Sequence, residues 1–266
     1  MSRPWEQPYS ERFAGRLPKV FVGFVAFGDI DPQILESTAH WCFQAGSRYS
    51  GVFEIHWGCA TRREQYRARN TLVEEAQKQE ADFLLMLDDD HLLSDCPDIL
   101  GHFFREEKPM QGGLYVQRRE DKSQPVIVKY DEAKREAGWC SWDEVPVDGG
   151  PVDVLGGGVN WCDMTIFDFL KQPHWWPYPA DRREVTFLPD QALGLDLQLS
   201  IGCKKLGIQP WLNGNVRVGH MIHERTVLRP PQVTGPVECT ACGGLASSTT
   251  KGEWECMTCK AQLRAA

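Results

Sequence analysis

Residues 81–90 read ADFLLMLDDD, an apolar run that ends in three consecutive aspartates. Strands that are buried on both faces read as continuous apolar runs, so residues 81–87 predict a central strand of a sheet. The three aspartates follow directly, at the carboxyl end of this predicted strand. Because ligands of open α/β sheets gather at that edge, the stretch predicts both a class of fold and the position of a site.

Strand and helix patterns alternate on the N-terminal side of this stretch. Residues 19–27 and 53–57 are short runs of apolar, β-branched and aromatic residues, which predict two further strands. Residues 32–44 and 62–79 space their apolar and charged residues as helices do. This alternation predicts an α/β domain whose mostly parallel sheet is covered by helices on both faces.

The pattern continues on the C-terminal side. Residues 109–115 and 210–218 predict strands, and residues 191–206 predict a helix. Residues 118–150 are weakly periodic, which is typical of a long loop or a small hairpin. Residues 171–190 are rich in proline and tryptophan, as substrate loops often are.

The composition is that of a globular protein, with 42% hydrophobic and 25% charged residues among 266. This length allows one large domain and an appendage. We predict an N-terminal extended arm over residues 1–18, a catalytic domain over 19–222, a proline-marked linker over 223–236 and a small domain over 237–266. No apolar run reaches the roughly 20 residues that span a bilayer, and the polar N-terminus lacks a signal-like core, so we expect a cytoplasmic protein. The net charge of -8 provides no general attraction to nucleic acid.

The three aspartates predict a metal site. Adjacent carboxylates repel one another, and a divalent cation relieves the repulsion. Oxygen ligands suit Mg²⁺ or Mn²⁺, which keep positions for water and phosphate. In extended backbone Asp88 and Asp90 point to one side and Asp89 to the other, so Asp88 and Asp90 are the predicted metal pair. A solvated acidic turn is the alternative interpretation of so short a motif.

The order of the motifs resembles that of the GT-A glycosyltransferases, particularly the large family-2-like group. An Arg-Asn segment at residues 66–73 precedes the strand that ends in the aspartates, as in that family. Residues 194–208, followed by Val218-Gly219-His220, resemble the family's acidic catalytic helix and its final histidine. The resemblance covers about residues 19–222. It implies a Rossmann-like GT-A fold and transfer of a sugar from a UDP- or GDP-sugar donor to a hydroxyl acceptor.

The resemblance also implies roles for individual residues. Asp88 and Asp90 would hold Mn²⁺ or Mg²⁺ against the donor diphosphate, and His220 would complete the metal site. Asp196 would be the base of an inverting displacement. Asp190 competes for this role, because the family's Glu-Asp pair is Leu-Asp here. The residues implied in donor binding are Ala26, Phe27, Asp29, Arg69, Asn70, Asp88, Asp89, Gly157 and Gly158.

Several of these residues have a plainer interpretation. Arg69 could belong to a solvated helix face, Asp29 to a turn, and His220 to the structural core. The glycines at 156–158 let a backbone approach a sugar closely, but they could equally form a flexible turn. Other candidates left open are a metal-ligand role for His223, a place in the acceptor and donor-sugar loop for Asp153, and sugar stacking by Trp161, Trp175 and Trp176.

Four of the ten cysteines form two C-x2-C pairs near the C-terminus: Cys239, Cys242, Cys256 and Cys259. Thirteen residues separate the pairs, a spacing compatible with the two knuckles of a zinc ribbon. Four thiolates fill a tetrahedron, so this Zn²⁺ would be structural and distinct from the catalytic metal. A redox dithiol is the alternative.

Two other functions also fit the sequence. One is a two-metal phosphoryl- or nucleotidyl-transfer enzyme, since such enzymes also gather carboxylates at strand ends. The other is a non-catalytic module that binds nucleotide sugars or nucleic acid. Because ribbons often bind nucleic acid, we hypothesise that the acceptor is a macromolecule such as a hydroxylated base in phage DNA.

Overall fold

The computed structural model describes residues 3–28, 30–61, 64–117, 124–131, 133–134, 136–146, 148–170, 195–221 and 227–230, and the backbone of four strands beyond residue 236. The chain divides into two compact units, Met1–Pro230 and Pro231–Ala266. This division falls inside the linker expected over residues 223–236. The domain boundaries expected from the sequence remain predictions.

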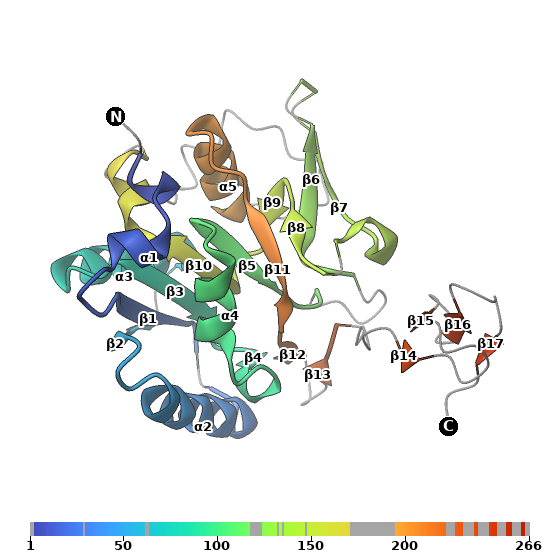
Figure 1. Ribbon diagram of the computed structural model, residues 1–266, viewed down its shortest axis with the longest axis horizontal. Helices are drawn as coiled ribbons and strands as arrows, with labels where there is room; N and C mark the ends of the chain where they lie inside the picture. The colour runs from blue at the N-terminus through green and yellow to red at the C-terminus, as the bar shows by residue number, and fades with distance from the viewer. Residues whose placement is uncertain are drawn as a thin grey trace. The chain divides into compact units, whose positions relative to one another are not determined.

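A seven-stranded sheet forms the centre of the first unit (Figure 1). In spatial order its strands are β2 (Glu54–Thr61), β1 (Lys19–Ala26), β3 (Phe83–Asp88), β10 (Val159–Asp163), β5 (Met110–Leu114), β11 (Trp211–Arg217) and β8 (Gly150–Pro151). β1 pairs in parallel with β2 and β3, and β5 with β11, whereas β10 and β8 run antiparallel to their neighbours. The mixed α/β class with a mostly parallel sheet is therefore confirmed.

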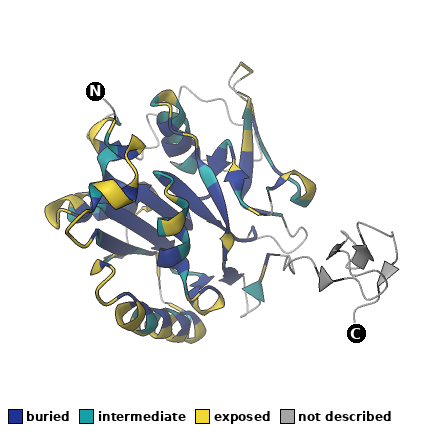
Figure 2. Cartoon of the chain, in the orientation of Figure 1, coloured by how far each residue is buried: buried dark blue, intermediate teal, exposed yellow. Residues whose placement is uncertain are grey.

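Helices cover both faces of the sheet, and the alternating side chains of β3 show why. The helices are α2 (Pro32–Arg48), α3 (Gln65–Lys78), α4 (Ile99–Glu106) and α5 (Leu195–Lys205). Leu84 and Met86 pack in one core cluster with side chains of α3 and α5. Phe83, Leu85 and Leu87 pack in a second cluster with side chains of α2 and α4. Figure 2 shows the inner strands β1, β3, β10 and β5 largely buried and the outer helix faces exposed.

Two small three-stranded sheets complete the described part of this unit. The first consists of β13 (Val227–Leu228), β12 (Gly219–Met221) and β4 (His91–Leu92). The second consists of β7 (Glu136–Trp139), β6 (Ile127–Asp131) and β9 (Val154–Leu155). The β6–β7 hairpin lies where the sequence predicted a loop or hairpin. Short helical turns η2 (Leu93–Asp95), η3 (Trp142–Glu144) and η4 (Met164–Asp168) join these elements.

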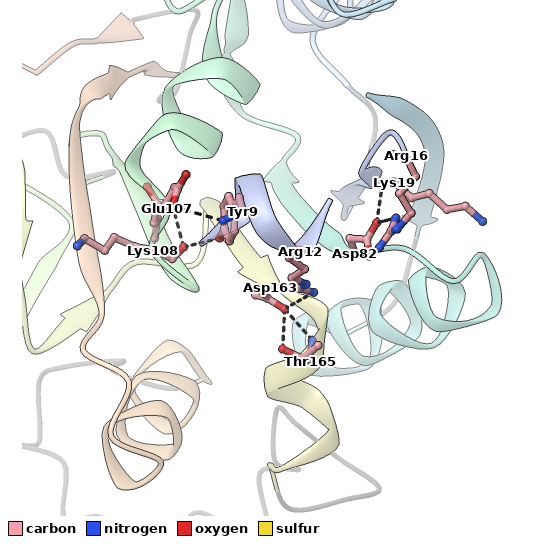
Figure 3. Close-up of polar contacts among 10 residues, drawn as sticks. Tyr9, Arg12, Arg16, Lys19, Asp82, Glu107, Lys108, Asp163 and Thr165 are labelled. Atoms are coloured by element: carbon pink, nitrogen blue, oxygen red, sulfur yellow. Dashed lines mark hydrogen bonds and ion pairs between the residues drawn. The ribbon is translucent and has the colours of Figure 1, made fainter. Parts of the chain in front are cut away.

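The N-terminal segment differs from the extended arm that we expected. It contains η1 (Pro4–Glu6) and α1 (Tyr9–Arg12), and its aromatic side chains Trp5, Tyr9 and Phe13 are buried. Arg12 binds the carboxylate of Asp163 on β10, and Arg16 binds Asp82 just before β3 (Figure 3). Burial of these three aromatic rings holds the segment against the domain. The prolines and polar residues around them led us to expect an extended arm instead.

The second unit contains a four-stranded antiparallel sheet of β14 (Val237–Glu238), β15 (Leu245–Ser248), β16 (Trp254–Cys256) and β17 (Gln262–Leu263). The backbone of Cys256 belongs to β16. Its side chain, together with Cys239, Cys242 and Cys259, lies outside the described residues, so the zinc ribbon remains a prediction.

Across the part of the chain that the structure describes, none of the helices is long and apolar enough to cross a lipid bilayer.

Candidate functional site

The candidate site lies at the carboxyl edge of the central sheet, where β3 ends at Asp88. The chain turns through Asp89 and Asp90 and continues as β4. β4 pairs antiparallel with β12, and the register places His220 opposite His91. Two segments more than a hundred residues apart thus bring two histidines to the end of the acidic run.

Each of the three aspartates contacts different residues. Asp88 binds the guanidinium of Arg69. Asp89 accepts a hydrogen bond of 2.9 Å from the backbone N–H of Phe27, which fixes the loop after β1. Asp90 lies against His91 and His220. The metal pair of Asp88 and Asp90 that we predicted from strand alternation remains untested, but the two carboxylates have different surroundings.

Asp90, His91 and His220 form a group able to hold a metal ion. Asp90 Oδ1 lies 3.0 Å from His91 Nδ1, and Asp90 Oδ2 lies 3.0 Å from His220 Nε2. One ligand atom from each residue lies within 4.8 Å of the others. Burial disfavours the Asp90 carboxylate, but the two imidazoles outweigh it and lower its pKa below the ordinary value. Carboxylate and imidazole donors fit a divalent metal.

The ring of His220 has a defined orientation. Its Nδ1 lies 2.6 Å from the carbonyl oxygen of Val116. A carbonyl only accepts, so Nδ1 carries the proton and Nε2 is the atom directed at Asp90. Metal-binding histidines commonly donate their other N–H to a backbone carbonyl in this way. His220 therefore has the surroundings expected of a ligand as well as the position.

Arg69 is a buried residue of α3, only 2% exposed, and is not part of a solvated helix face. Its Nη2 lies 3.0 and 3.1 Å from the two carboxylate oxygens of Asp88, and its Nη1 donates to the carbonyl oxygen of Gly157 at 2.7 Å. Burial raises the pKa of Asp88 to about 6, against the opposing attraction of Arg69. Arg69 therefore positions Asp88 and the glycine loop. Its predicted contact with the donor remains a prediction.

Asp196 lies in the first turn of α5, beside Gly157. Burial raises its pKa, while Arg69 and the backbone N–H of Gly157 act in the opposite direction. A Cβ atom at Gly157 would lie 2.6 Å from Arg69 Nη2 and 2.8 Å from Asp196 Cγ. Glycine is needed here because two charged side chains approach the backbone. Asp190, the other candidate base, lies outside the described residues.

Gly158 leaves room for the ring of His91. Its N–H donates to the hydroxyl of Tyr115 at 2.8 Å, and its carbonyl accepts from the N–H of Asp88 at 2.9 Å. A Cβ atom at this position would lie 2.5 Å from His91 Cε1. The glycines at 156–158 are thus closely packed, which argues against a plain flexible turn.

The remaining candidates have varied positions. Ala26 is buried at the end of β1, and Phe27 beside it is 41% exposed. Asn70 is buried on α3. Trp161 is fully buried and stacks on Phe83, so it belongs to the core and is not a surface for a sugar.

Asp153 contacts Lys204 at 2.6 Å, in an ion pair between the β8–β9 region and α5. The candidates outside the described residues are Asp29, Trp175, Trp176 and His223.

Two residues of the site were assigned no role from the sequence. His91 follows the aspartates directly, and a histidine beside an acidic run at a strand end was the available signal. Tyr115 follows β5 and packs edge-on against His91, with ring centroids 4.5 Å apart. Its neighbours lie far away in sequence, so no local pattern could have identified it.

Comparison with known proteins adds information on the fold. No family model matches the sequence, and no curated protein matches it. Among solved structures, A197 from STIV is similar over 84% of this chain and 100% of its own, with a TM-score of 0.50 and 14% identity. A UDP-glucose pyrophosphorylase complexed with UDP-glucose is similar over 74% of this chain and 90% of its own, with a TM-score of 0.41 and 6% identity. The first similarity concerns the fold alone, and the second is too distant to support any conclusion.

Proposed function

We propose that the protein is a metal-dependent glycosyltransferase that takes a sugar from a nucleotide-sugar donor. One observation supports this most strongly: a candidate metal group and a candidate base converge on the glycine loop. His91 packs against Gly158, and Asp196 packs against Gly157. A diphosphate leaving group needs a cation, and an acceptor hydroxyl needs a base.

The residues divide the work as follows. Mn²⁺ or Mg²⁺, held by Asp90 and His220, would neutralise the charge that develops on the departing diphosphate. Asp196 takes the proton of the acceptor hydroxyl while that oxygen bonds to the anomeric carbon and the bond to the diphosphate oxygen breaks. Asp89 holds the backbone of Phe27 in place at the end of β1, where the nucleoside would bind.

The direct test is a transfer assay with Mn²⁺ and a panel of UDP- and GDP-sugars. We expect release of a nucleoside diphosphate matched by sugar on the acceptor. Asp90→Asn removes a charged ligand at nearly constant size, so release should fall by about 10²-fold or more, since the cation stabilises the transition state. Asp31→Asn, a change at the N-cap of α2, is the control and should retain activity. Equal activity of Asp90→Asn and the wild type would contradict the proposal.

Nucleotidyl transfer is the second candidate, because a metal-bound diphosphate serves that reaction equally well. The same protein should then release pyrophosphate from a nucleoside triphosphate and a sugar 1-phosphate. Pyrophosphate without sugar transfer would favour this candidate over the first. Neither product would favour the non-catalytic binding module.

The acceptor proposal rests on the predicted ribbon alone. Duplex DNA that contains hydroxymethylated bases, offered beside unmodified DNA, tests it. We expect labelled sugar only on the hydroxylated duplex, and labelling of neither duplex would remove nucleic acid as the acceptor.

A further inference from the structure

We infer that His91 is a direct third metal ligand, so that two imidazoles and one carboxylate bind a transition-metal ion of the Mn²⁺ class in preference to Mg²⁺, with Asp88 outside the coordination shell. This inference deepens the proposed function and rests on its metal site. It differs from the ligand set that the sequence resemblance implied, which contained Asp88 and omitted His91.

His91 is buried. Its side chain is 1% exposed, and neither ring nitrogen has a hydrogen-bond partner in the described structure. Nδ1 lies 3.0 Å from Asp90 Oδ1, but this contact lacks hydrogen-bond geometry. An unsatisfied buried polar group is destabilising, because it has lost its hydrogen bonds to water. A cation beside Asp90 would satisfy the imidazole where it stands.

The ring of His91 is also fixed in place. It stacks on His220 with a centroid separation of 4.8 Å and an interplanar angle of 4°. Tyr115 packs against it at 86°, and Gly158 leaves no space on a further side. The ring cannot swing out to water without breaking these contacts. Its nitrogens are therefore held beside Asp90.

The separation of the donor atoms is also suited to a metal. Neighbouring ligands of an octahedral ion with bonds of about 2.1 Å lie about 3 Å apart. Both imidazole nitrogens lie 3.0 Å from oxygens of Asp90. Each imidazole nitrogen is therefore at a suitable separation from the carboxylate for a shared metal, and one ligand atom from each of the three residues lies within 4.8 Å of the others.

Asp88 is committed elsewhere. Both of its carboxylate oxygens accept hydrogen bonds from Arg69, whose guanidinium is buried. A cation bound to Asp88 would lie close to this buried positive charge and would be repelled by it. Asp88 is therefore a positioning residue of the site.

The donor set determines the preferred metal. Mg²⁺ favours all-oxygen octahedra and gives up water reluctantly, whereas imidazole suits transition metals. Three protein ligands leave other positions open for water or diphosphate oxygens. The two imidazole ligands therefore make the site favour Mn²⁺ over Mg²⁺.

Mn²⁺ binding to the full-length protein tests the inference without any reaction. Free Mn²⁺ is counted by its electron paramagnetic resonance signal during titration. We expect tight binding that survives a roughly hundredfold excess of Mg²⁺. His91→Phe keeps the ring contacts and removes both nitrogens, so affinity should fall at least tenfold, which is the lower bound of about 10–100-fold for even an outer-shell change. Asp88→Asn removes no ligand and should lose less affinity than His91→Phe, whereas His40→Phe, a change on the exposed side of α2, should stay within about threefold of the wild type.

A spectroscopic measurement on the wild type guards against misfolding of the variants. Electron spin echo modulation from ¹⁴N should show two imidazoles on bound Mn²⁺. Spectra with one imidazole, unchanged affinity in a folded His91→Phe variant, or ready displacement by Mg²⁺ would each overturn the inference. Tight two-imidazole binding without sugar transfer would leave the metal site standing and reject only the transferase.

Discussion

Arg69 interacts with the charges of two carboxylates, Asp88 and Asp196. Burial raises the pKa of both carboxylates, and the shared guanidinium acts in the opposite direction. This arrangement connects the candidate base to the acidic strand end through one side chain.

The role of Asp196 is testable by a change of one atom. Asp196→Asn keeps the size of the side chain but cannot take up a proton, so transfer should fall by about 10²-fold or more while donor affinity survives. Donor binding by calorimetry and transfer rates under saturating donor separate the two effects. Asp190→Asn is the matched variant. A dead Asp190→Asn beside an active Asp196→Asn would assign the base to Asp190, and two active variants would argue for a retaining course.

Gly157 is the residue most sensitive to a small addition. In Gly157→Ala the new methyl group would lie 2.6 Å from Arg69 Nη2 and must displace a buried ion pair. We expect a loss of about 1–3 kcal/mol in the free energy of unfolding, together with weaker transfer. Gly138→Ala on the β6–β7 hairpin has nothing within 4 Å of the new atom and should change stability by less than about 0.5 kcal/mol. Equal denaturation midpoints for both variants would show that the loop at residues 156–158 accommodates the added methyl group without loss of stability.

At the scale of elements, the N-terminal segment is attached by charge as well as by aromatic rings. Arg12 binds Asp163, whose side chain is fully buried on β10, while the half-exposed Arg16 binds Asp82, whose side chain is 12% exposed. The two pairs look alike in sequence. They should differ in energy because Asp163 would lose its cation in a fully buried site, whereas Asp82 keeps some access to water and the backbone N–H of Lys19.

Urea denaturation of two variants measures this difference. Arg12→Ala should lower the free energy of unfolding by about 3 kcal/mol or more, because it leaves the Asp163 carboxylate buried without its partner. Arg16→Ala should cost about 1 kcal/mol or less. Small and similar losses in both variants would indicate that the aromatic rings, and not the ion pairs, hold the segment.

At the scale of the whole molecule, the open question is what stabilises the second unit. A unit of this size buries too little apolar surface to fold without an additional cross-link, and four cysteines could supply one by binding a structural Zn²⁺. We expect one zinc per chain by elemental analysis of protein that was never exposed to chelator. Changing Cys239 and Cys256 to Ser together should abolish it. A wild-type protein without zinc would contradict the zinc-ribbon prediction. Zinc retained by the double variant would show that the metal is bound by other residues.

Much of the fold was predictable from local patterns. The apolar run at residues 81–87 predicted the central strand, since a strand buried on both faces must be continuously apolar. Alternation of strands and helices predicted the parallel sheet with helices on both faces. The N-terminal segment was the exception: Trp5, Tyr9 and Phe13 are spread among polar residues, so their joint burial depends on contacts distant in sequence.

For the site, the sequence was enough to predict carboxylates at the end of a central strand, because the apolar run and the acidic run are both local patterns. The contacts of each carboxylate follow from the tertiary structure alone. The pairing of β4 with β12 places His91 beside His220, and the packing of α3 gives Arg69 to Asp88. Alternation along a strand could not show this, because the run turns after Asp88 and its partners come from elements more than a hundred residues away or from a neighbouring helix.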